Sequence, residues 1–188
     1  MEMMLRNIAV AVFMLWLLLD GIVVFRRVSD KVENRDRFSL RVVVAANSLS
    51  WIVGIWLAYR PFGVMQPTIP TQIAGFVLLG LGILIRSIAI AQLGRFHTPN
   101  VAVLADHEVM DRGLYRYIRH PSYLGALIAF LGFSLALCNW LSLVVIMLLT
   151  PIAYLFRIHE EEAALGAALG ERYSDYVRRT KRLIPGIY

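Results

Sequence analysis

Four long stretches of uncharged, mostly apolar sequence constrain the fold of this chain more than any other feature. A helix needs about 20 such residues to cross the hydrocarbon core of a bilayer. Only 17% of the 188 residues are charged and the mean hydropathy is +0.64, whereas roughly 25% of residues are charged in a soluble domain. The sequence therefore excludes a water-soluble globule and a disordered chain, and it predicts an all-α integral membrane protein.

Five transmembrane helices are predicted from these stretches. The last stretch, 121–156, is too long for one span, and Asn139 at its middle marks a tight turn between two short spans. The expected spans are 7–25, 42–59, 73–93, 123–137 and 141–157. The chain then divides into an N-terminal part, 1–93, with three spans, and a C-terminal part, 94–188. This second part contains a polar connector, the helical hairpin 121–157 and a polar tail.

The basic residues lie almost entirely on one side of the predicted spans. Sixteen of the 19 Lys and Arg residues fall in the segments after the first and third spans and in the tail, and only Arg6 and Arg60 fall on the other side. Short cytoplasmic loops collect Lys and Arg. We therefore expect the N-terminus outside the cell membrane and the connector, tail and C-terminus in the cytoplasm. This topology accounts for the net charge of +6 without a nucleic-acid partner.

Asp20 lies inside the first predicted span, and Arg86 lies inside the third together with Gly75, Gly80 and Gly82. Charged side chains in lipid are costly and normally paired, so we expect Asp20 and Arg86 to pair as a structural link, with a direct catalytic role as the alternative. Gly75, Gly80 and Gly82 are expected to let helices pack closely rather than to form a nucleotide-binding loop. The four histidines lack the paired spacing of metal ligands and there is one cysteine, so no metal site is expected.

Chemistry is expected in the polar segments 95–120 and 157–188, because both are placed in the cytoplasm and can meet there. Pro121 fits the first turn of a helix, whose N–H groups favour an anion. Arg157 and Glu161 are four residues apart, so they share a face if the last span continues as a helix. The alternatives are that the connector tyrosines are interfacial anchors and that 160–162 is a solvated acidic turn paired with the basic clusters. The basic, tyrosine-containing segment 172–182 is expected on the anionic inner leaflet.

Three blocks of residues in this half resemble the isoprenylcysteine carboxyl methyltransferase (ICMT) family. The blocks are His107-x-Val109-x-x-x-Gly113-x-Tyr115, Arg119-His120-Pro121-Ser122-Tyr123-x-Gly125 and Arg157-Ile158-x-x-Glu161-Glu162-x-x-Leu165, followed by Gly170-x-x-Tyr173 and a closing Arg182 to Pro185. They occur in the family's order and cover the chain from Phe96 onward. The chain looks like a short prokaryotic, archaeal member with a minimal five-span version of the fold.

The resemblance implies a carboxyl O-methyltransferase that uses S-adenosylmethionine (SAM) and releases S-adenosylhomocysteine. The implied acceptor is a prenylated cysteine or a similar lipid-like molecule from the bilayer. The connector and the C-terminal helical tail would form the cofactor site. The implied cofactor-binding residues are His107, Glu108, Val109, Met110, Tyr115, His120, Pro121, Ser122, Tyr123 and Glu161. Arg157 would bind the lipid substrate, so Arg157 and Glu161 are the expected catalytic residues.

The chemistry of carboxylate methylation agrees with these residues. A carboxylate is ionised at neutral pH, so methyl transfer to it requires positioning rather than a base, and the guanidinium of Arg157 can hold it by a bidentate pair. An amine acceptor would need its proton removed, for which His159 or Glu162 is a candidate. A phosphatidylethanolamine N-methyltransferase is therefore the main alternative. An NADPH-dependent enzyme similar to sterol reductases and a non-enzymatic membrane scaffold are the remaining ones.

Overall fold

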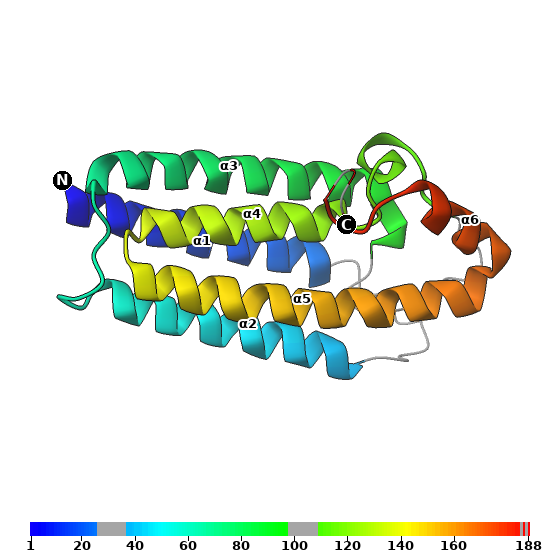
Figure 1. Cartoon of the computed structure of the whole chain (residues 1–188), viewed down its shortest axis with the longest axis horizontal. Coiled ribbons are helices and arrows are strands. Elements are labelled where there is room, and N and C mark those ends of the chain that lie inside the picture. The colour runs from blue at the N-terminus through cyan, green and yellow to red at the C-terminus, as the bar shows by residue number, and fades with distance from the viewer. Residues whose placement is uncertain (26–36, 98–108, 185, 187) are drawn as a thin grey trace.

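A computed structural model describes residues 1–25, 37–97, 109–184, 186 and 188. Its helices are α1 (Glu2–Phe25), α2 (Arg37–Ala58), α3 (Thr68–Leu93), η1 (Gly94–Phe96), η2 (Gly113–Arg116), α4 (Pro121–Ala136), α5 (Trp140–Leu169) and α6 (Glu171–Arg179). The five long helices run along one axis in alternating directions (Figure 1). Four of them, α1, α2, α3 and α5, are long and apolar enough to cross a membrane, and α4 is a shorter apolar helix. Each predicted span thus corresponds to one helix.

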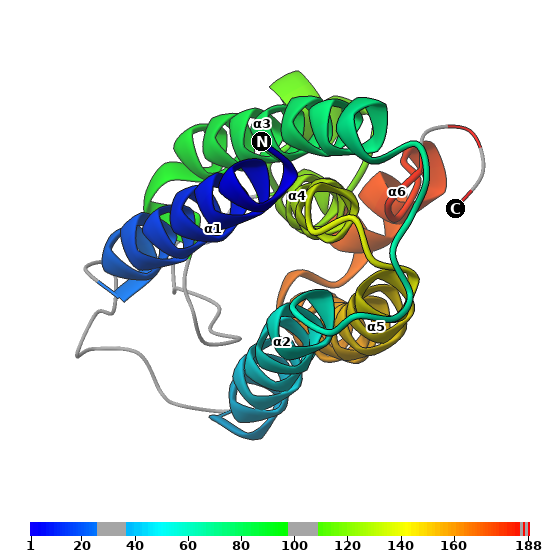
Figure 2. The same cartoon turned by 90° about the vertical axis from the view of Figure 1, so that its left-hand side faces the viewer.

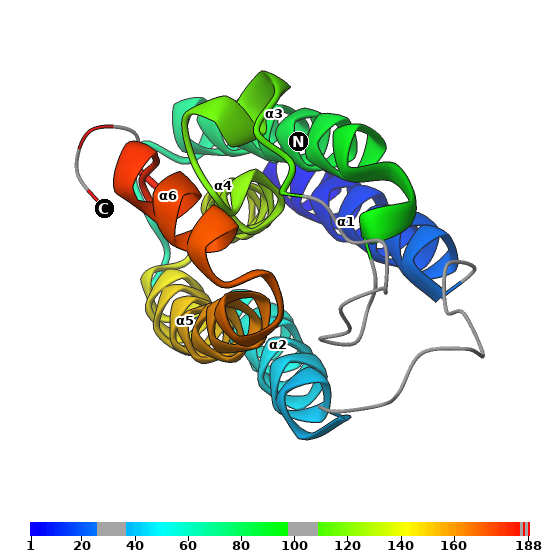
Figure 3. The same cartoon turned by 90° about the vertical axis from the view of Figure 1, so that its right-hand side faces the viewer.

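The helices form two groups that meet at α4. Seen along the bundle, α1 and α3 lie on one side of α4, and α2 and α5 lie on the other (Figure 2). The most extensive contacts are between α3 and α4 and between α2 and α5, and α4 also packs against α5. The opposite end view shows α6 and the C-terminal segment close to α5 (Figure 3). The polar residues that surround α6 are therefore gathered at one end of the bundle.

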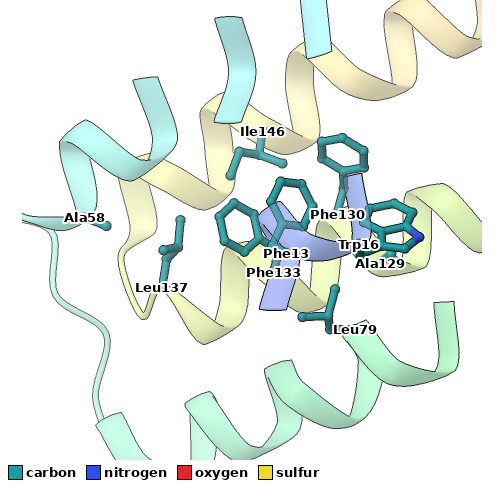
Figure 4. Packing of buried hydrophobic residues seen from close by; sticks show 9 residues of the cluster. All are labelled: Phe13, Trp16, Ala58, Leu79, Ala129, Phe130, Phe133, Leu137 and Ile146. Carbon is teal, nitrogen blue, oxygen red and sulfur yellow. The ribbon is translucent and has the colours of Figure 1, made fainter. Parts of the chain in front are cut away.

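The core of the bundle is aromatic, and its outer surface is apolar as well. The ring of Phe13 stacks on that of Phe133 with centroids 3.8 Å apart and meets Phe130 edge-on (Figure 4). On the outside, Val77 is 65% exposed and Leu148 is 57% exposed. Large apolar surfaces are rare on soluble monomers but suit contact with lipid. The arrangement is that of an integral membrane protein.

Glycines allow α3 and α4 to approach closely. A Cβ atom on Gly82 would lie 2.3 Å from the backbone nitrogen of Ala129, and one on Gly132 would lie 2.1 Å from that of Leu79. Gly75 faces the same helix, so the predicted packing role is confirmed for Gly75 and Gly82. For Gly80 it is wrong, because a Cβ there would have nothing within 4 Å. Two residues of helix turn a side chain by about 200°, which points Gly80 away from α4.

A valine at position 82 is expected to destabilise the protein strongly. The added side chain would collide with the α4 backbone, which cannot move aside as a flexible side chain does. Overpacking of this kind costs about 1 to 3 kcal/mol. Thermal unfolding in detergent checks this expectation, with Gly80→Val as the matched control because it makes the same change on the open side of the same helix. Equal unfolding temperatures for the two variants would contradict the close α3–α4 contact.

The turn predicted in the middle of the uncharged stretch 121–156 is confirmed. The side chain of Asn139 caps α5, because its Oδ1 accepts hydrogen bonds from the backbone nitrogens of Leu141 (3.0 Å) and Ser142 (3.1 Å). Its Nδ2 donates to the carbonyl of Phe62 (2.7 Å) in the loop between α2 and α3. From this cap α5 continues unbroken to Leu169, so Arg157 and Glu161 lie one turn apart on one helix, as expected.

Candidate functional site

The described part of the connector is anchored to the end of α3. Gly113 has a positive φ of 58°, which forms the predicted turn before Tyr115. The backbone nitrogen of Leu114 then donates to Oε1 of Gln92 (2.9 Å), and the hydroxyl of Tyr115 donates to the carbonyl of Ala89 (3.4 Å). Tyr115 is only 5% exposed, so its interpretation as an interfacial anchor is wrong. Its ring instead fixes the connector against α3.

Glu162 joins three segments that are distant in the sequence. Its Oε1 accepts from Nε of Arg119 (2.9 Å) and lies 3.1 Å from Nε2 of His120, and its Oε2 accepts from Nη2 of Arg182 (2.6 Å). The hydrogen bond to Glu162 raises the pKa of Arg182. These contacts agree with the alternative interpretation of 160–162, in which the acidic residues pair with the basic clusters. It ties the start of α4 and the C-terminal segment to α5.

The tyrosines of α6 face the protein. Tyr173 and Tyr176 are 6% and 4% exposed, and the hydroxyl of Tyr176 donates to the carbonyl of Tyr115 (2.7 Å). Burial raises the pKa of both hydroxyls, so both stay protonated. Both tyrosines of the segment 172–182, which is predicted on the inner leaflet, are thus buried in the protein. In the described residues, the buried hydroxyl of Tyr173 has no hydrogen-bond partner.

Tyr123 connects α4 to the residue pair predicted on α5. Its hydroxyl donates to Oε2 of Glu161 (2.8 Å), and its ring lies 5.2 Å from that of Tyr154. Glu161 is half-buried at this point. The first turn of α4, which begins at Pro121 as predicted, thus brings Tyr123 next to the carboxylate expected to contact the cofactor.

A pocket of about 340 Å³ lies between α1, α2, α3, α4 and α5. One part of its wall is polar and another is aromatic and aliphatic. The residues that matter for its chemistry are Trp16 and Asp20 of α1, Asn47 and Trp51 of α2, Arg86 of α3, Ser122, Tyr123 and Phe130 of α4, and Tyr154 and Arg157 of α5. Such a pocket suits a ligand with a polar head and an apolar tail.

Arg157 lies in this wall and is held by α2. Its side chain is buried, at 4% exposed, and its Nη1 donates to the hydroxyl of Ser39. Ser39 is also fully buried. A solvated surface pair with Glu161 is therefore excluded for Arg157. Sequence reasoning missed Ser39, because nothing in the local sequence shows that 39 and 157 meet.

The predicted pairing of Asp20 with Arg86 is confirmed. Nε and Nη2 of Arg86 donate to the two carboxylate oxygens of Asp20 at 2.6 and 2.7 Å. The remaining nitrogen, Nη1, donates to the backbone carbonyl of Ser122 (3.3 Å). The pair therefore joins α1 and α3 to the first turn of α4, and both side chains line the pocket.

The structure brings most of the predicted site residues to one end of the bundle. Ser122, Tyr123 and Arg157 line the pocket, and Glu161 is hydrogen-bonded to one of them. Tyr115 and His120 lie in the adjoining connector network. Val109 and Met110 are partly buried just before η2. His107 and Glu108 lie outside the described residues.

Comparisons with known proteins support one family. The family model for isoprenylcysteine carboxyl methyltransferase (ICMT) matches residues 73–167. The chain is 35% identical over 117 residues to "Protein-S-isoprenylcysteine O-methyltransferase" of Schizosaccharomyces pombe, covering 61% of this chain and 49% of the relative. It is 33% identical over 115 residues to "Probable protein-S-isoprenylcysteine O-methyltransferase" of Oryza sativa subsp. indica, covering 60% of each.

The solved structures give a similar result. A eukaryotic intramembrane Ras methyltransferase, ICMT, superposes with a TM-score of 0.64 at 27% identity, over 77% of this chain and 52% of that chain. The chain thus spans about half to three-fifths of the length of these relatives. The relatives named here are eukaryotic, and the archaeal source expected from the resemblance is not borne out.

Proposed function

The chain belongs to the isoprenylcysteine carboxyl methyltransferase family, and from this premise we propose that it transfers a methyl group from SAM to the carboxylate of a prenylated cysteine or a similar lipid-like acceptor. The observation that carries the proposal is the pocket. It presents the guanidinium of Arg157 and the side chain of Tyr123, whose hydroxyl donates to Glu161, beside an aromatic and aliphatic wall. A carboxylate with an apolar tail fits this combination, since the charged head and the tail each find a matching surface.

The residues around Glu161 suit SAM, which carries a sulfonium, an ammonium, a carboxylate and an adenine. The carboxylate of Glu161 would face the cationic part of SAM. The buried hydroxyl of Tyr173, which has no hydrogen-bond partner among the residues described, is a donor available to the cofactor. The residues proposed to hold SAM are His107, Glu108, Val109, Met110, Tyr115, His120, Pro121, Ser122, Tyr123 and Glu161. When bound, SAM supplies an electrophilic methyl group.

The pocket residues would perform the transfer by positioning. Arg157 would hold the acceptor carboxylate through a bidentate pair, and its bond to Ser39 limits the rotamers of the guanidinium. Trp16, Trp51 and Phe130 would cover the apolar tail and exclude water. Opposite charges disappear as the methyl group is transferred, so a site poor in water favours the reaction. No proton moves in this step.

The candidate bases for an amine acceptor are badly placed. His159 is exposed on α5, and Glu162 is bound by Arg119 and Arg182. One observation favours the phosphatidylethanolamine alternative, because His97 lines the pocket and an imidazole can accept a proton from an ammonium. The product of the reaction separates the two acceptors, as the Discussion describes.

Calorimetric titration of the purified protein with SAM and with NADPH tests the proposed class of reaction. Binding of SAM supports methyl transfer, and binding of NADPH instead supports an enzyme similar to sterol reductases. Binding of neither would leave a membrane scaffold without a cofactor. The protein is titrated in detergent, with heat-unfolded protein as the control for non-specific uptake.

The proposed topology places the site on the cytoplasmic side of the cell membrane. We expect a reporter fused after Tyr188 to be cytoplasmic and one inserted near Gln66 to be external, because of the excess of Lys and Arg at the α6 end of the bundle. Gln66 lies in the loop between α2 and α3, at the opposite end. Activity of paired phosphatase and fluorescent reporters measures both positions. An external C-terminus would contradict the proposed orientation.

A further inference from the structure

Two guanidinium groups line the pocket, and they are held by different walls. Arg86 of α3 is bound by Asp20 of α1, whereas Arg157 of α5 is bound by Ser39 of α2. The end view places α1 and α3 on one side of α4 and α2 and α5 on the other (Figure 2). Arg86 and Arg157 therefore approach the pocket from opposite sides.

The two walls differ in their position relative to Glu161, the proposed contact for the cationic part of SAM. Glu161 lies on α5, one turn beyond Arg157. An acceptor carboxylate held by Arg157 is thus next to the donor side. A carboxylate held instead by Arg86 would sit on the α1–α3 wall, on the other side of α4 from the helix that carries Glu161. Because any guanidinium in a water-poor pocket attracts a carboxylate, Arg86 is a competing binding site unless its charge is cancelled.

Asp20 cancels this charge with good geometry. Its two carboxylate oxygens accept hydrogen bonds from Nε and Nη2 of Arg86 at 2.6 and 2.7 Å, and the Ser122 carbonyl accepts one from Nη1 at 3.3 Å. All three guanidinium nitrogens are thereby engaged. The side chains of Asp20 and Arg86 are 18% and 12% exposed, so the pair is part of the pocket surface rather than of the packed core.

We propose that Asp20 is a specificity-determining residue of the pocket, which neutralises Arg86 so that the acceptor carboxylate binds on the Arg157 wall. The inference rests on the proposed function, because it needs an acceptor with a carboxylate. Asp20 lies outside the residues 73–167 that match the family model, so α1 contributes a polar group of its own to the site.

Charge cancellation predicts opposite effects for the two partners, which a structural link does not. Asp20→Asn leaves Arg86 charged and should favour an acid over its ester. Arg86→Gln leaves the carboxylate of Asp20 in the pocket and should disfavour the acid. The double variant Asp20→Asn/Arg86→Gln removes both charges and should restore the parental preference. If the pair were only structural, all three variants would lose stability without changing this preference.

The test compares binding of N-acetyl-S-farnesylcysteine with that of its methyl ester to the full-length protein and these variants in detergent. Asp20→Asn is expected to raise the acid-to-ester affinity ratio by about tenfold, the effect of one hydrogen bond to a charged group. It should also lower both KM and kcat for the acid, because the tighter binding is unproductive. Thermal unfolding shows whether each variant is folded. If Asp20→Asn does not fold, Arg86→Gln provides the second test.

Two outcomes overturn the inference, and they are distinguishable. In the first, the acid-to-ester affinity ratio stays at the parental value in Asp20→Asn and in Arg86→Gln, while the parent binds the acid and transfers methyl to it. This result contradicts the inference alone. In the second, the parental protein binds neither ligand and transfers no methyl group. This result contradicts the proposed function and also the inference that rests on it.

Discussion

Replacing Arg157 by Ala is expected to abolish most methyl transfer while leaving SAM binding near the parental value. The guanidinium is proposed to hold the acceptor carboxylate, and the cofactor is proposed to bind at other side chains. Removing one partner of a buried, hydrogen-bonded charge pair costs on the order of 2 to 5 kcal/mol, which is at least about thirtyfold in rate. Arg157→Lys should recover little activity, because an ammonium lacks the bidentate fork of a guanidinium.

Initial rates and calorimetric SAM affinity are measured side by side for these variants. Ser39→Ala is the matched structural control, since it removes the same hydrogen bond but keeps the guanidinium, and it should retain much more activity than Arg157→Ala. Arg178→Ala, at an exposed ion pair of α6, controls for the loss of an arginine. Turnover close to the parental rate in Arg157→Ala would refute the carboxylate role and favour the amine-methylating alternative.

Glu161→Gln is expected to raise the Kd for SAM. The substitution keeps the size of the side chain and removes the negative charge proposed to face the cationic part of the cofactor. Hydrogen bonds to charged groups contribute about 1.5 to 3 kcal/mol, so the expected increase in Kd is about tenfold or more. Tyr123→Phe removes the hydroxyl that donates to Glu161, and it should weaken SAM binding less than the loss of the charge does.

Calorimetry of Glu161→Gln beside Glu160→Gln measures this effect. The control removes the same charge from the neighbouring residue, which points to another side of α5 because successive residues are about 100° apart on a helix. A matching increase in Kd for both variants would indicate a general effect of net charge. An unchanged Kd in Glu161→Gln would contradict the proposed cofactor contact.

The helices and their turns were predictable because they depend on local sequence. Uncharged runs of sufficient length define the spans, and the cap at Asn139 follows from one polar residue in a long apolar stretch. The Asp20–Arg86 pair was predictable for a related reason: two charges at similar depth in a membrane protein have few other ways to be stabilised. The orientation of Gly80 was not predictable, since it depends on which face of α3 meets α4.

The parts of the site that sequence reasoning missed depend on contacts between distant segments. Ser39 and Arg157 are 118 residues apart, and no local pattern links them. The three partners of Glu162 come from the start of α4 and from the C-terminal segment, so its interpretation as a possible base could be corrected only by the fold. Tyr173 and Tyr176 alternate with charged residues as interfacial tyrosines do, yet α6 turns them toward the protein.

Transfer of labelled methyl from SAM is the measurement that tests the central claim most directly. The purified protein is incubated with N-acetyl-S-farnesylcysteine or phosphatidylethanolamine, and each labelled product is then treated with base. A methyl ester is cleaved and releases volatile labelled methanol, whereas an N-methyl amine keeps its label. The account predicts label on the farnesylated acid that base releases, and loss of that product in Arg157→Ala. Label carried only by phosphatidylethanolamine and stable to base would contradict it.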